Sequence, residues 1–306
     1  MKNKFRIFIL SLLLILLLNG LAYAKEWSFV VFSDNHGYYN KYKLTLNFIK
    51  DLYKKGAPEV AFMLAAGDTS PVEENWGIYN NIFPDKKPLY FPAAGNHELD
   101  CIRYRIFISQ DILQPLDNII TRHDEKDLNY YFDAENVRVI MLDQYSDFGI
   151  GNDHGWVTKE GAAWLQETIE AAPEKIEHIF IVMHEPPFGR FRHTRTHLSK
   201  DEINCWNMLV KHKRVKAVFC GHIHNYYKMQ VKDPQKAINP ASGYPHEEGG
   251  LLMINDGSAG TNWESDKKLT VVQVVIDDED VKFKTYQSPY LLSDFKVTEG
   301  WNLEER

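Results

Sequence analysis

Two histidines stand one residue apart at the end of an apolar run, in the stretch VFCGHIHN at residues 218–225. In an extended segment, residues i and i+2 point the same way, so His222 and His224 are expected to face one site. Asp34 and His36 have the same spacing after the run SFVVFS. Paired imidazoles and carboxylates are typical ligands of divalent metal ions, and metal-assisted hydrolysis is the chemistry that such a set serves.

Other ligand-type side chains also follow apolar runs. They are Asp68 after FMLAAG, Asn96 and His97 after YFPAAG, and His184 after IFIVM. Ligands of open α/β sheets gather at the carboxyl ends of strands, so we expect these side chains to converge although they span most of the chain. A glycine directly precedes several of them, at Gly67, Gly95 and Gly221, where the absence of Cβ lets the backbone turn sharply from strand into loop.

The nature of these groups indicates the kind of metal centre. Carboxylate, amide and imidazole groups without a thiolate suit borderline to hard divalent ions such as Mn, Fe or Zn. The set is larger than the three or four protein ligands of one catalytic zinc, so we predict two ions with one bridging carboxylate. Such a centre generates a metal-bound hydroxide at neutral pH and offsets charge on the attacking and leaving oxygens of a displacement at phosphorus.

The elements that must position these groups follow an α/β pattern, in which short runs rich in Val, Ile and Phe alternate with segments of helical period. The expected strands are Trp27–Phe32, Glu59–Ala65, Pro88–Ala94, Val137–Leu142, His178–Met183 and Val215–Cys220. The expected helices are Lys43–Leu52, Trp164–Ala171 and Lys200–Lys211, the last opening with the capping box Ser199-x-x-Glu202. After residue 251 the runs LLMIND, LTVVQVVID and VKFKTYQ predict further strands, with a turn at 277–280.

Five blocks of the sequence resemble, in order and at ordinary spacing, those of the calcineurin-like metallophosphoesterase family. The blocks are Asp34-Asn35-His36, Gly67-Asp68, Gly95-Asn96-His97-Glu98, His184 and Gly221-His222-Ile223-His224. The resemblance covers roughly residues 27 to 260, and the blocks are highly specific when they occur together. It implies an α/β fold in which a sandwich of two β-sheets is flanked by helices, as a single domain.

The resemblance also implies a role for each site residue. Asp34, His36 and His224 would hold the first metal, Asp68 would bridge, and Asn96, His184 and His222 would hold the second. His97 would contact the phosphate and protonate or stabilise the leaving oxygen. The purple acid phosphatase branch has a tyrosine and a glycine where this chain has Pro71 and His36, so a tyrosinate-coloured ferric site is not expected. Glu185 stands where many relatives have a second histidine.

The expected function is hydrolysis of small phosphoric esters, as a phosphomonoesterase or a phosphodiesterase. A hydroxide bridging the two ions would be the nucleophile, with His97 assisting the leaving group. The alternative is a non-catalytic, metal-stabilised binding module on the same scaffold, since fold and metal do not by themselves imply turnover. Taken singly, a histidine after a strand is usually structural, and Asn96 would be an N-cap or turn residue; the blocks favour the catalytic interpretation only together.

The first 24 residues are expected to be a signal peptide, leaving a domain of residues 25–306. Lys2, Lys4 and Arg6 precede an apolar run, and Ala22-Tyr23-Ala24 has the form of a cleavage site. An uncleaved anchor is the alternative, but the run is shorter than the roughly 20 residues of a spanning helix. Export to the periplasm or the exterior would follow. Loss of three cationic residues takes the formal charge from −7 to −10, which disfavours nucleic acid as a partner.

Several further residues have two interpretations each. Arg190, Arg192 and His193 lie in a basic stretch that follows His184, and they either bind the charged end of a substrate or belong to a solvated loop. Tyr226 and Trp263 either stack on a substrate ring or pack. The three cysteines, Cys101, Cys205 and Cys220, are expected to be buried thiols, with one disulfide permitted by an exported location.

Overall fold

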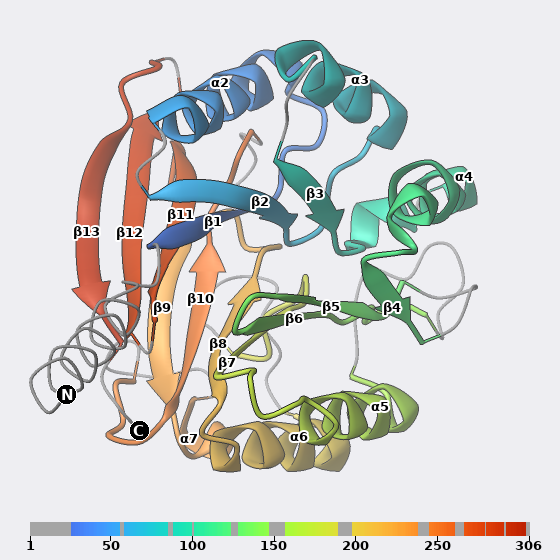
Figure 1. The fold of residues 1–306 in the computed structure, drawn as a ribbon, viewed down its shortest axis with the longest axis vertical. Helices are drawn as coiled ribbons and strands as arrows, with labels where there is room; N and C mark the ends of the chain where they lie inside the picture. Colours follow the sequence, from blue (N-terminus) through green and yellow to red (C-terminus); the bar gives the residue numbers. More distant parts are fainter. Residues whose placement is uncertain are drawn as a thin grey trace, which may run out of the picture.

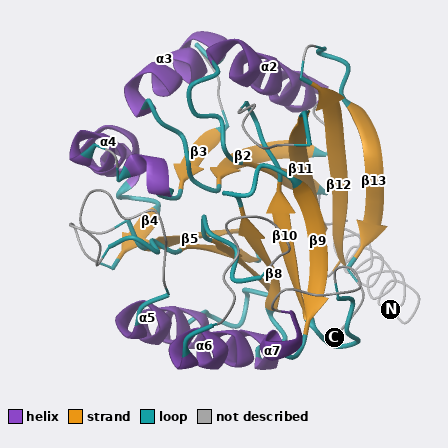
Figure 2. Ribbon diagram, turned by 180° about the vertical axis from the view of Figure 1, so that it is seen from behind, coloured by secondary structure: helices purple, strands orange, loops and turns teal. Residues whose placement is uncertain are grey.

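The chain folds into two β-sheets packed face to face between two layers of helices (Figure 1; Figure 2 shows the view from behind). The computed structural model describes residues 26–55, 58–84, 88–99, 101–123, 128–146, 157–188, 198–237, 245–260, 266–278, 280–290 and 292–303. The signal-peptide segment, the basic stretch with Arg190, Arg192 and His193, and Trp263 lie outside the described residues.

The first sheet has six strands and carries the amino-terminal half of the predicted site. Its order is β13 (Lys296–Asn302), β12 (Asp280–Pro289), β11 (Lys268–Asp277), β1 (Trp27–Phe32), β2 (Glu59–Ala65) and β3 (Leu89–Pro92). Strands β1, β2 and β3 pair in parallel, so their carboxyl ends meet at one edge. Strands β11, β12 and β13 join β1 as an antiparallel meander.

The second sheet has seven strands and carries the rest of the predicted site. Its order is β4 (Ile120–Arg122), β5 (Tyr130–Ala134), β6 (Val137–Met141), β7 (His178–Val182), β8 (Val215–Cys220), β10 (Leu251–Asp256) and β9 (Tyr226–Val231). Strands β6, β7, β8 and β10 are parallel neighbours, and the remaining pairs are antiparallel. The carboxyl ends of β7 and β8 therefore also meet at a single edge.

Helices cover the outer faces of the two sheets. Helices α2 (Tyr39–Lys55) and α3 (Val72–Ile82) lie over the first sheet, and α5 (Lys159–Glu170), α6 (Lys200–Lys211) and α7 (Pro234–Ala237) lie over the second (Figure 1). The short α4 (Ile102–Phe107) leads into a π-helical segment, Ile108–Leu113. Within the described part of the chain, no helix combines the length and the apolar character that crossing a bilayer requires.

Aromatic side chains fill the space between the sheets. Phe29 of β1 is fully buried, its ring stacks on Phe62 of β2 at 5.0 Å, and it meets Phe180 of β7 edge-on at 5.1 Å. Because β1 and β7 belong to different sheets, this contact joins the two halves of the sandwich. Strands covered on both faces need apolar residues at nearly every position, which explains the continuous runs in the sequence.

The fold class and the single-domain architecture predicted from the sequence are confirmed. Strands β1, β2 and β8 and helix α6 have the predicted bounds, and Ser199 and Glu202 form the expected reciprocal capping bonds of 3.1 Å and 2.8 Å. The cysteines are free; Cys205 and Cys220 are buried, whereas Cys101 is half-buried and not the buried thiol that was expected.

We predict that Phe29→Ala lowers the free energy of unfolding by about 3–5 kcal/mol, because it removes the ring that joins the sheets and leaves a cavity. Urea unfolding of the folded chain measures the change. Ile102→Ala is the control: this side chain is 59% exposed, so its loss is expected to cost under about 0.5 kcal/mol. Equal losses in both variants would contradict the assigned role of Phe29.

Candidate metal centre

The seven predicted ligands and His97 all lie in loops that directly follow strands. Asp34 and His36 follow β1, Asp68 follows β2, Asn96 and His97 open a 3-10 turn (Asn96–Glu98) after β3, His184 follows β7, and His222 and His224 follow β8. Both sheets place these strand ends at the same side of the sandwich. The convergence expected from the sequence is therefore present.

The side chains gather into two clusters whose potential ligand atoms lie within 4.8 Å of one another. The first cluster contains Asp34, His36, Asp68 and His224, and the second contains Asp68, His184 and His222. Asp68 belongs to both clusters. This is the arrangement that a bridging carboxylate between two ions requires.

Asn96 lies with the second cluster. Its Oδ1 is 3.2 Å from Nε2 of His184 and 3.0 Å from Nδ1 of His222. Nδ1 of His184 is 2.7 Å from the carbonyl oxygen of Ala66, and because a carbonyl only accepts, this ring nitrogen donates. Nε2 of His184 is thereby directed at Asp68 Oδ2, 3.2 Å away.

Both carboxylates of the centre are almost completely removed from water. Asp34 is 0% exposed and Asp68 is 1% exposed. Burial opposes ionisation of Asp68, but His184, His97 and His36 outweigh it and hold its pKa well below the usual range. For Asp34, burial is likewise outweighed, chiefly by His224, so its pKa is also lowered.

The donor set is suited to divalent cations. Two buried, ionised carboxylates need positive charge close by, and a metal ion supplies it without a further hydrogen-bonding group. Burial lowers the pKa of His36, which keeps its imidazole in the neutral form that binds metals, and its buried Nε2 has no hydrogen-bond partner among the described residues. Carboxylates, an amide and imidazoles together match Mn, Fe or Zn.

The backbone reaches this arrangement in a way that the sequence did not predict. Asp34, Asp68, His222 and His224 have φ values of 52°, 54°, 72° and 58°. His222 and His224 reach one centre as expected, but the expected extended backbone is wrong, because left-handed turns direct His224 into the first cluster and His222 into the second. Such conformations are uncommon outside glycine and concentrate at functional sites.

The glycines beside the ligands serve mainly to leave room. A Cβ on Gly95 would collide with the carboxylate and backbone nitrogen of Asp68, and one on Gly221 would lie 2.8 Å from Asp34 Oδ2. Gly95 itself has extended backbone, so close approach and not a sharp turn explains it. Gly67 combines both reasons, since its φ is +88° and a Cβ would overlap the ring of His184.

His97 occupies the mouth of the centre. It is 38% exposed, its ring stacks on that of His36 at 4.2 Å, and its Nε2 lies 3.9 Å from Asp68 Oδ2. Its backbone nitrogen donates to Asp68 Oδ1 at 3.0 Å, which fixes the loop against the shared carboxylate. A ring that is half-exposed beside the buried clusters can reach a molecule arriving from solvent.

Glu98 holds two site loops together, a role that the sequence did not disclose. Its buried carboxylate accepts hydrogen bonds from the backbone nitrogens of Asp68, Thr69 and Gly95 at 3.0, 2.8 and 2.6 Å. Burial, and next the charge of Asp68, raise the pKa of Glu98 to about 7. The acidic residue at the end of the block Gly95-Asn96-His97-Glu98 was the only available signal.

A second supporting contact joins residues far apart in the chain. The hydroxyl of Ser33 lies 2.5 Å from Asp34 Oδ2 and also contacts Asp256 Oδ1. Burial, and the charge of Asp34, raise the pKa of Asp256 well above its ordinary value, whereas that of Asp34 is lowered. Since a hydroxyl carries one hydrogen, Ser33 can donate to only one of the two carboxylates, and the raised pKa of Asp256 favours Asp34 as the acceptor and Asp256 as the protonated partner.

Two other residues singled out in the sequence have structural contacts. The hydroxyl of Tyr226 is 2.8 Å from Glu299 Oε2 and 2.9 Å from Thr285 Oγ1, which supports the packing interpretation. Glu185 is 2% exposed, and its backbone exchanges two hydrogen bonds with the side chain of Gln144. Neither side chain belongs to the two clusters.

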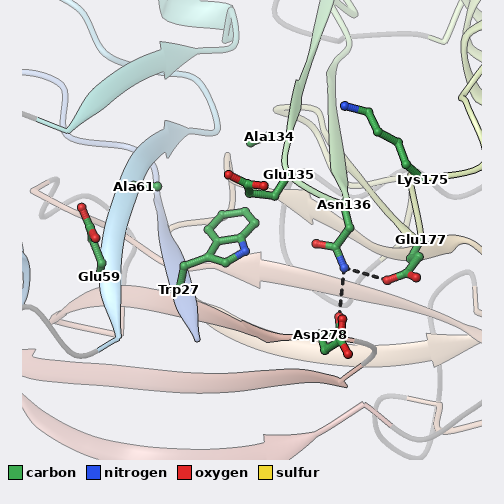
Figure 3. A pocket seen from close by; sticks show the side chains of 9 residues that line it. All are labelled: Trp27, Glu59, Ala61, Ala134, Glu135, Asn136, Lys175, Glu177 and Asp278. Atoms are coloured by element: carbon green, nitrogen blue, oxygen red, sulfur yellow. Dashed lines mark hydrogen bonds between the residues drawn. The ribbon is translucent and has the colours of Figure 1, made fainter. Parts of the chain in front are cut away.

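A cavity of about 1020 Å³ lies at the other end of the sandwich (Figure 3). Its lining includes Trp27 and Glu59, the first residues of β1 and β2, together with Glu177, which precedes β7. Asn136 donates to Glu177 Oε2 at 2.7 Å and to the carbonyl of Asp278 at 3.0 Å across it. Because the predicted ligands follow the opposite ends of these strands, this cavity is separate from the metal centre.

The sandwich and the ligand clusters at its edge are those expected of a metal-dependent phosphoesterase. The chain belongs to the calcineurin-like phosphoesterase family, whose model matches residues 28–226. The resemblance stated from the sequence blocks is therefore confirmed.

Some of the curated relatives carry phosphodiesterase names. A 3′,5′-cyclic adenosine monophosphate phosphodiesterase, CpdA of Vibrio vulnificus, is 24% identical over 60% of this chain and 62% of its own length. The glycerophosphodiester phosphodiesterase GpdQ of Enterobacter lignolyticus is 27% identical over 41% of this chain and 45% of its own. The chain thus matches less than two thirds of the length of these relatives.

A solved structure has the same fold. The dimetal phosphatase from Danio rerio superposes with a TM-score of 0.59, over 92% of this chain and 99% of that one, at 12% identity. At this identity the likeness concerns the fold alone.

We predict that Asp256→Asn preserves stability, because the amide still donates to Ser33. Asp256→Leu is expected to lower the free energy of unfolding by about 1–3 kcal/mol, since it leaves a buried hydroxyl without a donor. Urea unfolding of both variants in the metal-free state gives the comparison. An equal loss of unfolding free energy in the two variants would contradict the assignment of a proton to the Asp256 carboxyl group.

Metal binding at neutral pH is expected to release protons. Burial lowers the pKa of His184, but Asp68 outweighs it and raises the pKa to about 10, so the free imidazole is protonated at pH 7. Ligation needs the deprotonated ring, whereas the carboxylates have already lost their protons. Metal affinity therefore rises with pH up to about 10, with about one proton released at the second cluster.

Calorimetric titration with Zn²⁺ in two buffers of different ionisation enthalpy measures this release. An observed enthalpy that does not depend on the buffer would contradict the assignment of a protonated His184.

Proposed function

We propose that the chain is an exported, dinuclear metal-dependent hydrolase of phosphoric esters. The observation that carries the proposal is the pair of ligand clusters that share the buried Asp68, with His97 beside them at the open side. A single-ion site needs no second cluster, and a structural metal site is normally closed by its own ligands.

The proposed ligand sets follow the two clusters. Asp34, His36 and His224 would hold one ion, Asn96, His184 and His222 the other, and Asp68 would bridge both. The distances between Asn96 and the two histidines support its inclusion, although an amide is the weakest donor of the set. The ions would be Mn, Fe or Zn, which this mixture of oxygen and nitrogen donors does not separate.

When bound, two divalent ions activate water near neutral pH and offset the charge that develops on a phosphoryl group. The chain's own contribution is to hold that group still and to supply a proton to the leaving oxygen. His97 would supply this proton; in support, stacking on His36 and the bond from its backbone to Asp68 hold its loop while its ring remains half-exposed. Its imidazole would act as the general acid of the reaction.

Phosphodiesters are the first substrates to test, because two relatives are named for diester hydrolysis. Monoesters remain within the proposal. The basic stretch with Arg190, Arg192 and His193 is proposed to bind the charged end of the substrate, on the ground that guanidinium groups pair well with phosphate.

Export rests on the beginning of the sequence. Lys2, Lys4 and Arg6, the apolar run after them and the Ala22-Tyr23-Ala24 site have the order of a cleavable signal peptide. A mature protein in the periplasm or outside the cell would meet small esters, and its negative charge disfavours nucleic acid.

We expect His97→Ala to reduce kcat for bis-p-nitrophenyl phosphate or p-nitrophenyl phosphate by about 100-fold or more, because proton donation to the leaving oxygen is lost. Metal content should stay unchanged, which element analysis of the purified variant checks. Asp68→Asn is expected to lose both turnover and metal, since the shared charge disappears. His246→Ala, a matched change at an exposed histidine away from the clusters, should retain full activity.

Two ions bound tightly by the wild-type chain, without turnover of either ester, would instead favour the non-catalytic binding module.

A further inference from the structure

A second hollow lies beside the proposed metal centre, with a volume of about 550 Å³. We call it the tyrosine pocket. Its lining consists of Gly37, Tyr38, Tyr39, Asn40, Lys41, Leu44 and Tyr290. Six of these residues form the start of α2 and the turn before it, and Tyr290 directly follows β12.

The tyrosine pocket is built onto the loops that carry the ligands. Gly37 directly follows His36, and its backbone nitrogen donates to the carbonyl of Ser70 at 3.2 Å, two residues beyond Asp68. Strand β12 runs in the same direction as β1, since both are antiparallel to β11. Tyr290 therefore lies at the same edge of the sheet as Asp34, which places the pocket on the side of the molecule that carries the metal ligands.

The walls of the pocket are aromatic and partly open to water. Tyr38 is 37% exposed and Tyr39 is 39% exposed, whereas Tyr290 is only 7% exposed and forms the floor. The ammonium group of Lys41 is 4.0 Å from the ring centroid of Tyr290 and 4.8 Å from that of Tyr38. The ammonium group thus lies over the faces of both rings as a cation–π contact, and the half-exposed ring of Tyr39 is a further aromatic part of the lining.

We propose that the tyrosine pocket binds a planar aromatic group of the substrate, a nucleobase or an aryl ring, while the phosphate lies at the metal centre. The inference rests on the proposed function and narrows its substrate class to esters that carry such a group. Stacking of an aromatic ring on tyrosine contributes favourable binding free energy, and this contribution depends little on which ring is stacked. The ammonium group of Lys41 can donate a hydrogen bond to a ring nitrogen or carbonyl oxygen of a nucleobase. A simple aryl group has no such acceptor.

The test compares AMP with ribose 5-phosphate, which share the phosphate and the ribose; ribose 5-phosphate carries a hydroxyl where AMP carries the base. Each is used as a competitive inhibitor of ester hydrolysis by the metal-loaded mature chain. We expect the inhibition constant of AMP to be about tenfold lower or better, as stacking of one base implies. Phenyl phosphate is the third compound: inhibition as strong as that of AMP identifies an aryl ring as sufficient, and weaker inhibition identifies the nucleobase.

The double variant Tyr38→Leu/Tyr39→Leu should bring the ratio of the AMP and ribose 5-phosphate constants close to one. Both side chains are exposed, so the fold is expected to tolerate the change. Tyr38→Phe/Tyr39→Phe is the matched control, and it should keep the ratio because it keeps the rings. Equal constants in the wild-type chain, or a ratio that survives in the leucine variant, would overturn the proposal.

Failure of the proposed function gives a different result. If no phosphoric ester is hydrolysed, calorimetric dissociation constants of the same compounds replace the inhibition constants. A preference for AMP that depends on the two rings would then support the pocket without the activity, and no preference would overturn it.

Discussion

The structure depends on the ionised carboxylate of Asp68, buried where the two sheets meet. A charge in such a place is tolerated only when opposite charge or several donors surround it. The chain supplies them from every side: His184 from the second sheet, His36 and His97 from the first, and a backbone donor from the loop after β3. The positions of the loops after β1, β2, β3 and β7 therefore follow from the need to surround the Asp68 carboxylate with histidines and hydrogen-bond donors.

Close approach to that carboxylate also determines the local sequence. Gly95 packs where any side chain would collide with Asp68, and Glu98 binds the backbone on both sides of the contact. Asp68 itself has φ of 54°, a conformation of higher energy for a residue with a side chain. The aromatic core around Phe29 is what supports such strained loops, since its burial stabilises the strands from which they emerge.

Much of this fold could be predicted because its central strands are buried on both faces. Continuous apolar runs ending in Gly-Asp or Gly-His give the bounds of β2 and β8 directly. Helix α3 is not predicted from the sequence, because its residues, VEENWGIYNNI, are largely polar and include a central glycine. Tertiary packing, and not local propensity, makes this segment helical. Strands β4, β5, β9 and β13 lack such runs; β9 alternates between buried and half-buried positions, and β13 is an exposed edge.

The convergence of the candidate ligands could be predicted from the sequence, but their geometry could not. Ligand-type residues after strands indicated which side chains converge, yet left-handed turns, and not strand alternation, separate His222 from His224. The contact from Asp256 to Ser33 joins residues 223 positions apart, which no local pattern reveals. The tyrosine pocket likewise combines Tyr290 with residues at the start of α2, which lie far apart in the sequence.

Each cluster contains residues from both sheets, which has a mechanical consequence. His224 joins Asp34 and His36 across the sandwich, and His184 and His222 join Asn96 in the same way. Ions bound there would act as cross-links between the layers, and saturation at 100 times the dissociation constant adds about 2.7 kcal/mol to the cost of separating them. Amide hydrogen exchange in β1 and β7 would then slow together, so that the sandwich opens as one cooperative unit.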